Sequence, residues 1–126
     1  MKIVVDTSIL SDYLRDGTQW EDLLLTAPRN AELFLPTIVV FELFSEQSTK
    51  NVSVQKEIFG LVEKFQKIDL TEKISKRAGE LLRDMKLNLE VPDYIIAASA
   101  FEINGVVVTL NTKHFQKIPG LNLFPL

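Results

Sequence analysis

The sequence predicts an α/β fold, a three-layer α/β/α sandwich in which helices cover both faces of a central parallel sheet of four to five strands. Residues 3–5 and 106–108 are short β-branched runs without polar residues, as expected of strands buried on both faces of a parallel sheet. Segments with apolar residues at helical spacing lie between these runs and two other short apolar runs. Strands that alternate with helices indicate a parallel sheet between two helical layers.

In the first half of the chain, predicted strands alternate with predicted helices, and one segment could be either. After the first strand we expect a helix from Thr7 or Ser8 to about residue 14, a Thr18-capped helix over residues 19–27, and a strand over residues 33–35. In residues 36–44, three successive β-branched residues favour a strand. Pro36 would break a central strand, however, and the apolar residues recur at helical spacing. We therefore predict a helix with Thr37 as its N-cap.

The second half repeats the alternation. We expect an amphipathic helix over residues 54–66, a strand over 67–70, and a helix capped by Thr71 that ends near residue 85. Pro92 marks the first turn of another helix, which ends at Asn104-Gly105. The fourth strand, residues 106–109, is followed by a short helical turn over 112–115 and an extended piece over 121–124.

Composition indicates one globular domain spanning residues 1–126. Hydrophobic residues make up 46% and charged residues 25% of the chain, which are ordinary values for a globular protein. The chain has no cysteine, which excludes disulfides and thiolate metal sites and fits a reducing compartment. Met1 leads directly into a strand, and the most apolar stretch, residues 33–44, is too short to span a membrane. We therefore expect a cytoplasmic protein without a membrane partner.

The net charge of −3 limits how this protein can bind nucleic acid. Proteins that bind nucleic acid mainly by neutralising phosphates are usually basic, whereas this chain has a pI of about 5.2. Binding of nucleic acid would therefore need a local cationic patch or a bound cation.

Four polar residues fall where a strand or loop leads into a helix. Asp6 directly follows the first strand, and Asn111 closely follows the fourth. If these strands are neighbours, their carboxyl ends bring the two residues together, at the edge where parallel sheets bind ligands. Glu42 lies on the helix after the second strand. Asp93 lies in the first turn of the Pro92 helix, where the helix dipole favours its ionised form.

A cluster of such acids predicts a bound cation. Two carboxylates about 5 Å apart repel by roughly 3 kcal/mol at an effective dielectric constant of about 20, so three of them need protons or a cation. Oxygen ligands without cysteine or a histidine pair favour Mg²⁺ or Mn²⁺. Such ions lower the pKa of a water molecule and bind phosphodiesters. Thr7 or Ser8 would donate a hydrogen bond to a carboxylate or to a metal-bound water.

Each candidate also has a purely structural explanation. Asp6, Thr7 or Ser8 can be a helix cap, and Asp93 a favourable first-turn charge, whereas Glu42 is harder to explain in so apolar a helix. His114 is the only histidine, and a lone histidine is more often a surface residue than a general base. Lys113, His114 and Lys117 form either a cationic rim for RNA phosphates or a solvated loop. Four other acids are assigned to solvated faces or turns: Asp12, Asp16, Glu46 and Asp69.

Motifs in order along the chain resemble those of PIN-domain ribonucleases, and most closely the VapC-type toxins of toxin–antitoxin pairs. The resemblance covers essentially the whole chain, including the closing Ile118-Pro119-Gly120-Leu121. Its four main motifs are Val4-Val5-Asp6-Thr7-Ser8, Pro36-Thr37-Ile38-Val39-Val40-Phe41-Glu42-Leu43, Pro92-Asp93-Tyr94-Ile95-Ile96-Ala97-Ala98 and Thr109-Leu110-Asn111-Thr112-Lys113-His114-Phe115.

This resemblance implies an Mg²⁺- or Mn²⁺-dependent endoribonuclease that forms a homodimer and is neutralised by a cognate antitoxin. It implies that Asp6, Glu42 and Asp93 are metal ligands. Asn111 occupies the fourth catalytic position, where an amide orients a metal-bound water or the substrate. The supporting hydroxyls are Thr7, Ser8 and Thr109. Leu110 departs from the family pattern, which often has arginine or another polar residue there.

Two other functions stay open at this point. Aspartyl-phosphate phosphatases also place an aspartate after the first strand, but they usually carry a second acid two residues later, where this chain has Ser8. A non-catalytic binding module would use the acidic pocket to receive an arginine of a partner protein.

Overall fold

The computed structural model describes all 126 residues and contains a four-stranded sheet with the strand order β3-β2-β1-β4. All three strand pairings are parallel, and β1 is paired with both β2 and β4. The strands are β1 (Lys2–Val5), β2 (Glu32–Pro36), β3 (Gln66–Ile68) and β4 (Val106–Val108). The predicted parallel sheet is therefore confirmed, and the condition that the first and fourth strands are neighbours is met.

The register between β1 and β4 fixes which residues leave the sheet together. Val5 of β1 lies opposite Val108 of β4. The backbone N–H of Asp6 then donates to the carbonyl oxygen of Val108 at 3.0 Å. The residues that follow these strands, Asp6 and Thr109, therefore emerge side by side at the carboxyl edge of the sheet.

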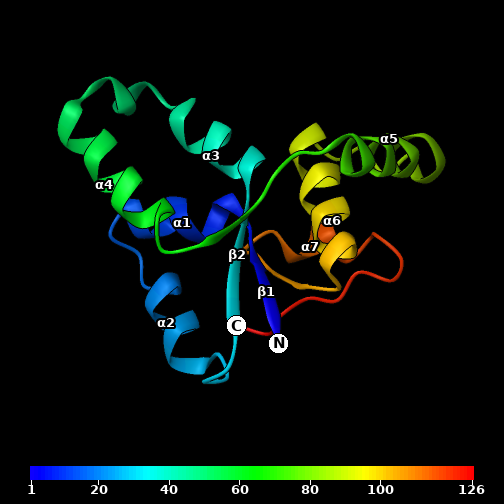
Figure 1. Cartoon of the computed structure of the whole chain (residues 1–126), viewed down its shortest axis with the longest axis horizontal. Helices are drawn as coiled ribbons and strands as arrows, with labels where there is room; N and C mark the ends of the chain where they lie inside the picture. The colour runs from blue at the N-terminus through cyan, green and yellow to red at the C-terminus, as the bar shows by residue number, and fades with distance from the viewer.

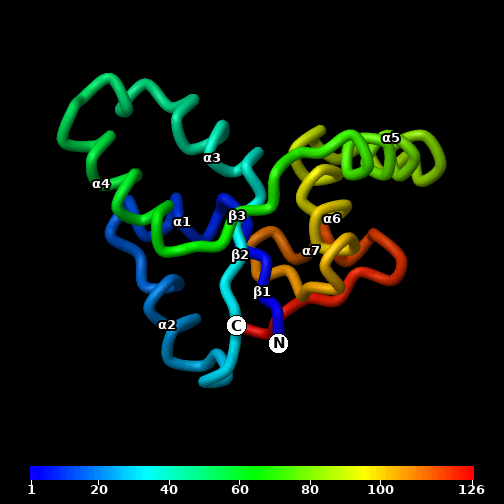
Figure 2. The backbone as a smooth tube through the Cα atoms, viewed as in Figure 1, coloured from blue at the N-terminus to red at the C-terminus, as the bar shows by residue number.

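Helices lie on both sides of the sheet, as predicted. In Figure 1, α1, α2 and α4 lie on one side of β1 and β2, and α5 and α6 lie on the other, with the same arrangement visible in the backbone trace of Figure 2. The α-helices are α1 (Thr7–Leu14), α2 (Gln19–Thr26), α3 (Thr37–Phe44), α4 (Val52–Val62), α5 (Glu72–Met85), α6 (Val91–Ile103) and α7 (Thr112–Phe115), and a 3₁₀ helix, η1, spans Gln47–Lys50. None of these helices combines the length and apolar character required to cross a lipid bilayer.

The core is one cluster of 28 buried hydrophobic residues that spans the sheet and the helical layers. Ile3, Val4 and Val5 of β1 are completely buried, which explains why this strand has no polar alternation. The helical assignment of residues 37–44 is also confirmed. Val39 and Leu43, four residues apart, are the buried residues of α3.

The structure corrects the predicted end of the helix expected over residues 54–66, and its four strands agree with the predicted four to five. We expected a helix over residues 54–66, but α4 ends at Val62, and β3 already begins at Gln66. Phe65 continues the helical spacing of apolar residues and is buried, although it lies beyond the helix. Beyond the end of α4, Lys67 donates from Nζ to the carbonyl oxygens of Val62 and Phe65. The piece over 121–124 makes only an isolated bridge, between Leu123 and Val107, so the sheet has four strands.

Two predicted helix caps are wrong. Thr18 makes no capping hydrogen bond, and Asp12 caps α2 instead, since its Oδ2 accepts from the backbone N–H of Gln19 at 3.1 Å. Asp12 therefore has a structural role and is not a solvated surface acid. Thr37 does not cap α3 either, because its Oγ1 accepts from the backbone N–H of Leu70 at 3.1 Å. The Thr18 hydroxyl instead donates to Asp22 Oδ2 within α2, whereas Thr37 bonds a segment that is distant in sequence.

Candidate active site

Three acids approach the carboxyl edge of the sheet from three different elements. Asp6 lies between β1 and α1, Glu42 lies on α3, and Asp93 lies in the first turn of α6. Helix α6 packs against β1 and against α3, which brings the three elements together. Asp6 is only 3% exposed, whereas Glu42 and Asp93 are half-buried.

The Asp6 carboxylate is held through a single oxygen atom. Ser8 Oγ and Thr109 Oγ1 both donate to Asp6 Oδ2, each at 2.7 Å. These hydroxyls in turn accept the backbone N–H groups of Leu110 and Asn111, each at 2.9 Å. The network fixes the orientation of Asp6 and ties the start of α1 to the chain that follows β4. It leaves Asp6 Oδ1 without a hydrogen bond from another side chain.

Glu42 is held in a comparable way by one hydroxyl. Thr7 Oγ1 donates to Glu42 Oε1 at 2.7 Å. Burial raises the pKa of the Glu42 carboxyl, the hydrogen bond from Thr7 opposes this change, and the negative charges of Asp6 and Asp93 raise the pKa further. Within the chain, the partner of this acid in an apolar helix is therefore the hydroxyl group of Thr7, which contacts only one of its two oxygens.

The pKa of Asp93 is also raised, in contrast to the expectation from the helix dipole. Burial is the largest cause, and the charge of Asp6 adds to it. A backbone hydrogen bond with Glu90 and the positive charge of His114 act in the opposite direction, but they do not outweigh burial and repulsion. Position in the first helical turn alone thus does not keep this carboxyl at its ordinary pKa.

No lysine or arginine neutralises these three acids. The three ion pairs in the structure lie elsewhere, on α5 and at the end of α6, and join Lys73 to Glu102, Lys76 to Glu80 and Arg83 to Asp84. The charges of Asp6 and Asp93 raise the pKa of Glu42, and the charge of Asp6 raises that of Asp93, but no three acidic or histidine side chains are placed so that they could hold a metal ion as they stand in this structure. The all-oxygen donor set and its uncompensated repulsion fit a hard divalent cation.

The fourth predicted position, Asn111, lies just before α7. Its backbone N–H donates to Thr109 Oγ1, and its side chain is exposed and forms no hydrogen bond within the chain. The hydroxyl network therefore connects Asn111 to Asp6 through Thr109. Sequence reasoning missed that two hydroxyls converge on the same oxygen of Asp6. The available signal was Thr109 directly after β4 and Ser8 two residues after Asp6.

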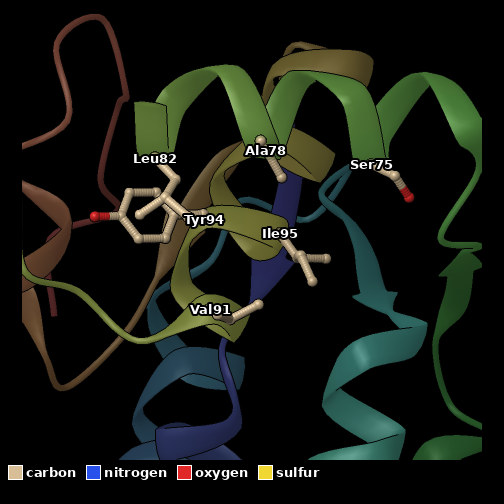
Figure 3. Close-up of a pocket in the computed structure, with 7 residues that line it drawn as sticks. Ser75, Ala78, Leu82, Val91, Tyr94 and Ile95 are labelled. Carbon is tan, nitrogen blue, oxygen red and sulfur yellow. The ribbon is translucent and has the colours of Figure 1, made fainter. Parts of the chain in front are cut away.

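Hollows elsewhere on the molecule do not include the three acids. One of about 200 Å³ lies between α5 and α6 and is mostly apolar. Figure 3 shows Ala78 and Leu82 of α5 above Tyr94 and Ile95 of α6 at this place. A second hollow of about 310 Å³ is lined by parts of α1, α3 and α4.

Comparison with known proteins relates this fold and site to one family. The PIN domain family matches residues 3–121. Ribonuclease VapC10 of Mycobacterium tuberculosis is 29% identical over 122 residues, which cover 94% of this chain and 90% of that protein. VapBC2 of Rickettsia felis, solved bound to a promoter DNA fragment, matches with a TM-score of 0.80 and 24% identity over 98% of both chains. A toxin–antitoxin complex from Klebsiella pneumoniae matches with a TM-score of 0.76 and 25% identity over 94% of both chains. The family match spans almost the whole chain, and the chain therefore belongs to the PIN domain family.

Proposed function

We propose that this protein is an endoribonuclease that hydrolyses RNA phosphodiester bonds and acts as the toxin of a toxin–antitoxin pair. The observation that carries the proposal is the meeting of Asp6, Glu42 and Asp93 at one sheet edge, with raised pKa values for Glu42 and Asp93 and no lysine or arginine partner. Membership of the PIN domain family and the similarity to a protein named ribonuclease VapC10 support the proposed substrate.

Asp6, Glu42 and Asp93 would hold Mg²⁺ or Mn²⁺ through their carboxylate oxygens. When bound, such a cation lowers the pKa of a water molecule and stabilises the charge that develops on the phosphate. Thr7 occupies Oε1 of Glu42, and Ser8 and Thr109 occupy Oδ2 of Asp6, so each of these two acids is free to present its other oxygen to the cation.

The remaining side chains orient the reactants. Asn111 is exposed next to the acids and offers an amide that would orient a water molecule or the RNA. Hydrolysis forms a bond between the water oxygen and phosphorus and breaks the bond from phosphorus to one ribose oxygen. No side chain at this edge is assigned as a general base in this proposal.

The proposal extends to the biological setting of the enzyme. We place residues 1–126 in one nuclease domain that acts on RNA in the cytoplasm, forms a homodimer and is neutralised by a cognate antitoxin. Support for the antitoxin comes from the similarity to solved toxin–antitoxin complexes from Rickettsia felis and Klebsiella pneumoniae.

An RNA cleavage assay with and without EDTA tests the proposed activity. The parent protein should cut RNA in Mg²⁺ or Mn²⁺, stop in EDTA, and recover when the metal is restored. Asp93→Asn should cleave at least about 100-fold more slowly, because ligand loss removes part of the several kcal/mol that a metal contributes. Glu102→Gln, which changes an acid at the other end of α6, is the matched control and should cleave like the parent.

Two results of this assay would count against the proposal. Cleavage that continues unchanged in EDTA would exclude a metal-dependent nuclease. The absence of any cleavage by the parent, together with tight binding of an arginine-bearing partner that Asp93→Asn abolishes, would instead identify the acidic edge as a binding site.

A further inference from the structure

The short helix α7 places one exposed histidine beside the acidic edge. It begins immediately after Asn111 and is anchored by Phe115, which is completely buried, and by Ile118, which is 2% exposed. The backbone N–H groups of His114 and Phe115 both donate to the carbonyl oxygen of Asn111, at 3.0 and 3.3 Å. The backbone of His114 is therefore fixed relative to β4, while its side chain faces solvent.

His114 lies close enough to the site to act on one of its acids, and no partner within the chain uses its side chain. Among the groups that act on the pKa values of Glu42 and Asp93, His114 is the only basic side chain, and it lowers the pKa of Asp93. Its imidazole forms no hydrogen bond and no ion pair in the structure, and neither does the ammonium group of the neighbouring Lys113. The donors of both side chains are therefore available to a ligand.

A polyanion that approaches this edge needs such donors. The chain carries a net charge of −3, and three acids already lie at the site, so the phosphates of an approaching strand are repelled. A cation held by the acids would neutralise the phosphate that reacts, but it would not neutralise the neighbouring phosphates of the same RNA strand. We propose that His114, supported by Lys113, binds an RNA phosphate adjacent to the one that is cleaved. This inference rests on the proposed ribonuclease function and assigns a substrate contact within it.

The competing role for His114 is to balance the charge of Asp93 without touching RNA. The two roles differ in what the loss of the side chain changes. A phosphate contact predicts weaker RNA binding even in the absence of metal, together with a higher KM and an unchanged kcat. Charge balance for Asp93 predicts altered affinity for Mn²⁺ with no change in RNA binding by the metal-free protein.

Fluorescence anisotropy with a labelled single-stranded RNA oligonucleotide, measured in EDTA, separates these roles. Each phosphate contact to a single strand contributes about 0.7 to the slope of log affinity against log salt. His114→Gln should therefore weaken binding about eightfold near 50 mM salt and about threefold near 200 mM salt, on the same basis. His114→Lys keeps a cation at this position and should bind at least as tightly as the parent.

Two matched controls make the experiment decisive. Gln116→Ala changes an exposed uncharged residue next to α7 and reports on the integrity of the turn. Lys64→Gln removes an exposed cation that precedes β3 and so lies at the opposite, amino edge of the sheet. Both controls should bind RNA within about twofold of the parent, because neither removes a phosphate contact at the site.

Several results would overturn the inference. RNA binding by His114→Gln within twofold of the parent would do so, as would an equal loss in Lys64→Gln, which would indicate only an effect of total charge. A fall in kcat at constant KM would place His114 at the reacting atoms instead. These failures are distinct from failure of the proposed function, because metal-dependent cleavage by the parent would persist in each of them.

Discussion

Replacing Asp6 with asparagine is expected to reduce RNA cleavage by about 1,000-fold, because a metal contributes several kcal/mol to the reaction and each 1.36 kcal/mol is a factor of ten. The hydroxyls of Ser8 and Thr109 both donate to one oxygen of the side chain at position 6. They will therefore hold the single amide oxygen of asparagine in that place. The amide NH₂ group is then left facing the cation, which it cannot bind.

The fold of this variant should be intact or slightly more stable, because the substitution removes a repelling charge from the acidic edge. Asp22→Asn, on the exposed face of α2, is the matched control and should cleave RNA at the parental rate. Cleavage should be measured as single-turnover rates, with circular dichroism to establish folding. Parental activity in a folded Asp6→Asn protein would remove Asp6 from the catalytic site.

Replacing Glu42 with glutamine is expected to stabilise the metal-free protein near pH 7. The folded protein raises the pKa of Glu42 above its ordinary value of 4.5 through burial and the charges of Asp6 and Asp93. Removing this charge should raise the free energy of unfolding by roughly 1 kcal/mol, an estimate kept small because the carboxyl is half exposed to screening solvent. For a chain of this length that corresponds to an increase in Tm of about 3–6 °C.

Glu42 and Asp93 should make the folded protein less stable as the pH rises, which is the opposite of the usual effect of a carboxyl group in a folded protein. A carboxyl whose pKa is raised by folding favours the folded state when it is protonated. Its contribution is therefore complete below the unfolded value, near 4.5 for Glu42 and 3.8 for Asp93, and is lost as the pH rises through the folded pKa. The advantage of Glu42→Gln over the parent should accordingly be present near pH 7 and disappear below about pH 4.5.

Thermal unfolding in EDTA across this pH range measures the effect. Glu63→Gln, an exposed acid that follows α4, is the control and should change Tm by less than about 2 °C at every pH. A Glu42→Gln protein that is less stable than the parent near pH 7 would show that the hydrogen bond from Thr7 outweighs the burial and repulsion of the charged carboxyl.

Much of the fold was predictable because β1 and β4 contain short runs of buried β-branched residues. Val4 and Val5, with Val107 and Val108, lie in runs without a polar residue, and this pattern indicates strands of a parallel sheet that is covered on both faces. Placing Asp6 and Asn111 after these strands was enough to predict that they lie at one edge. Glu42 was identifiable because an acid in an apolar helix needs a partner.

The details that the sequence did not predict depend on contacts between distant segments. Asp12 and Thr37 each bond a backbone N–H outside their own helix, which no local pattern indicates. Phe65 has the spacing of a helical residue but lies past the end of α4. The raised pKa of Asp93 depends on burial and on Asp6, so its position in the first turn of α6 gave the opposite expectation.

The central claim is that the three acids hold a divalent cation that the proposed cleavage requires. Isothermal titration calorimetry with Mn²⁺, comparing the parent with Asp6→Asn in the same buffer, tests this claim most directly. We predict saturable Mn²⁺ binding by the parent that EDTA reverses, and no measurable binding by the variant. Equal Mn²⁺ affinity in the two proteins, or no binding by the folded parent, would contradict the account.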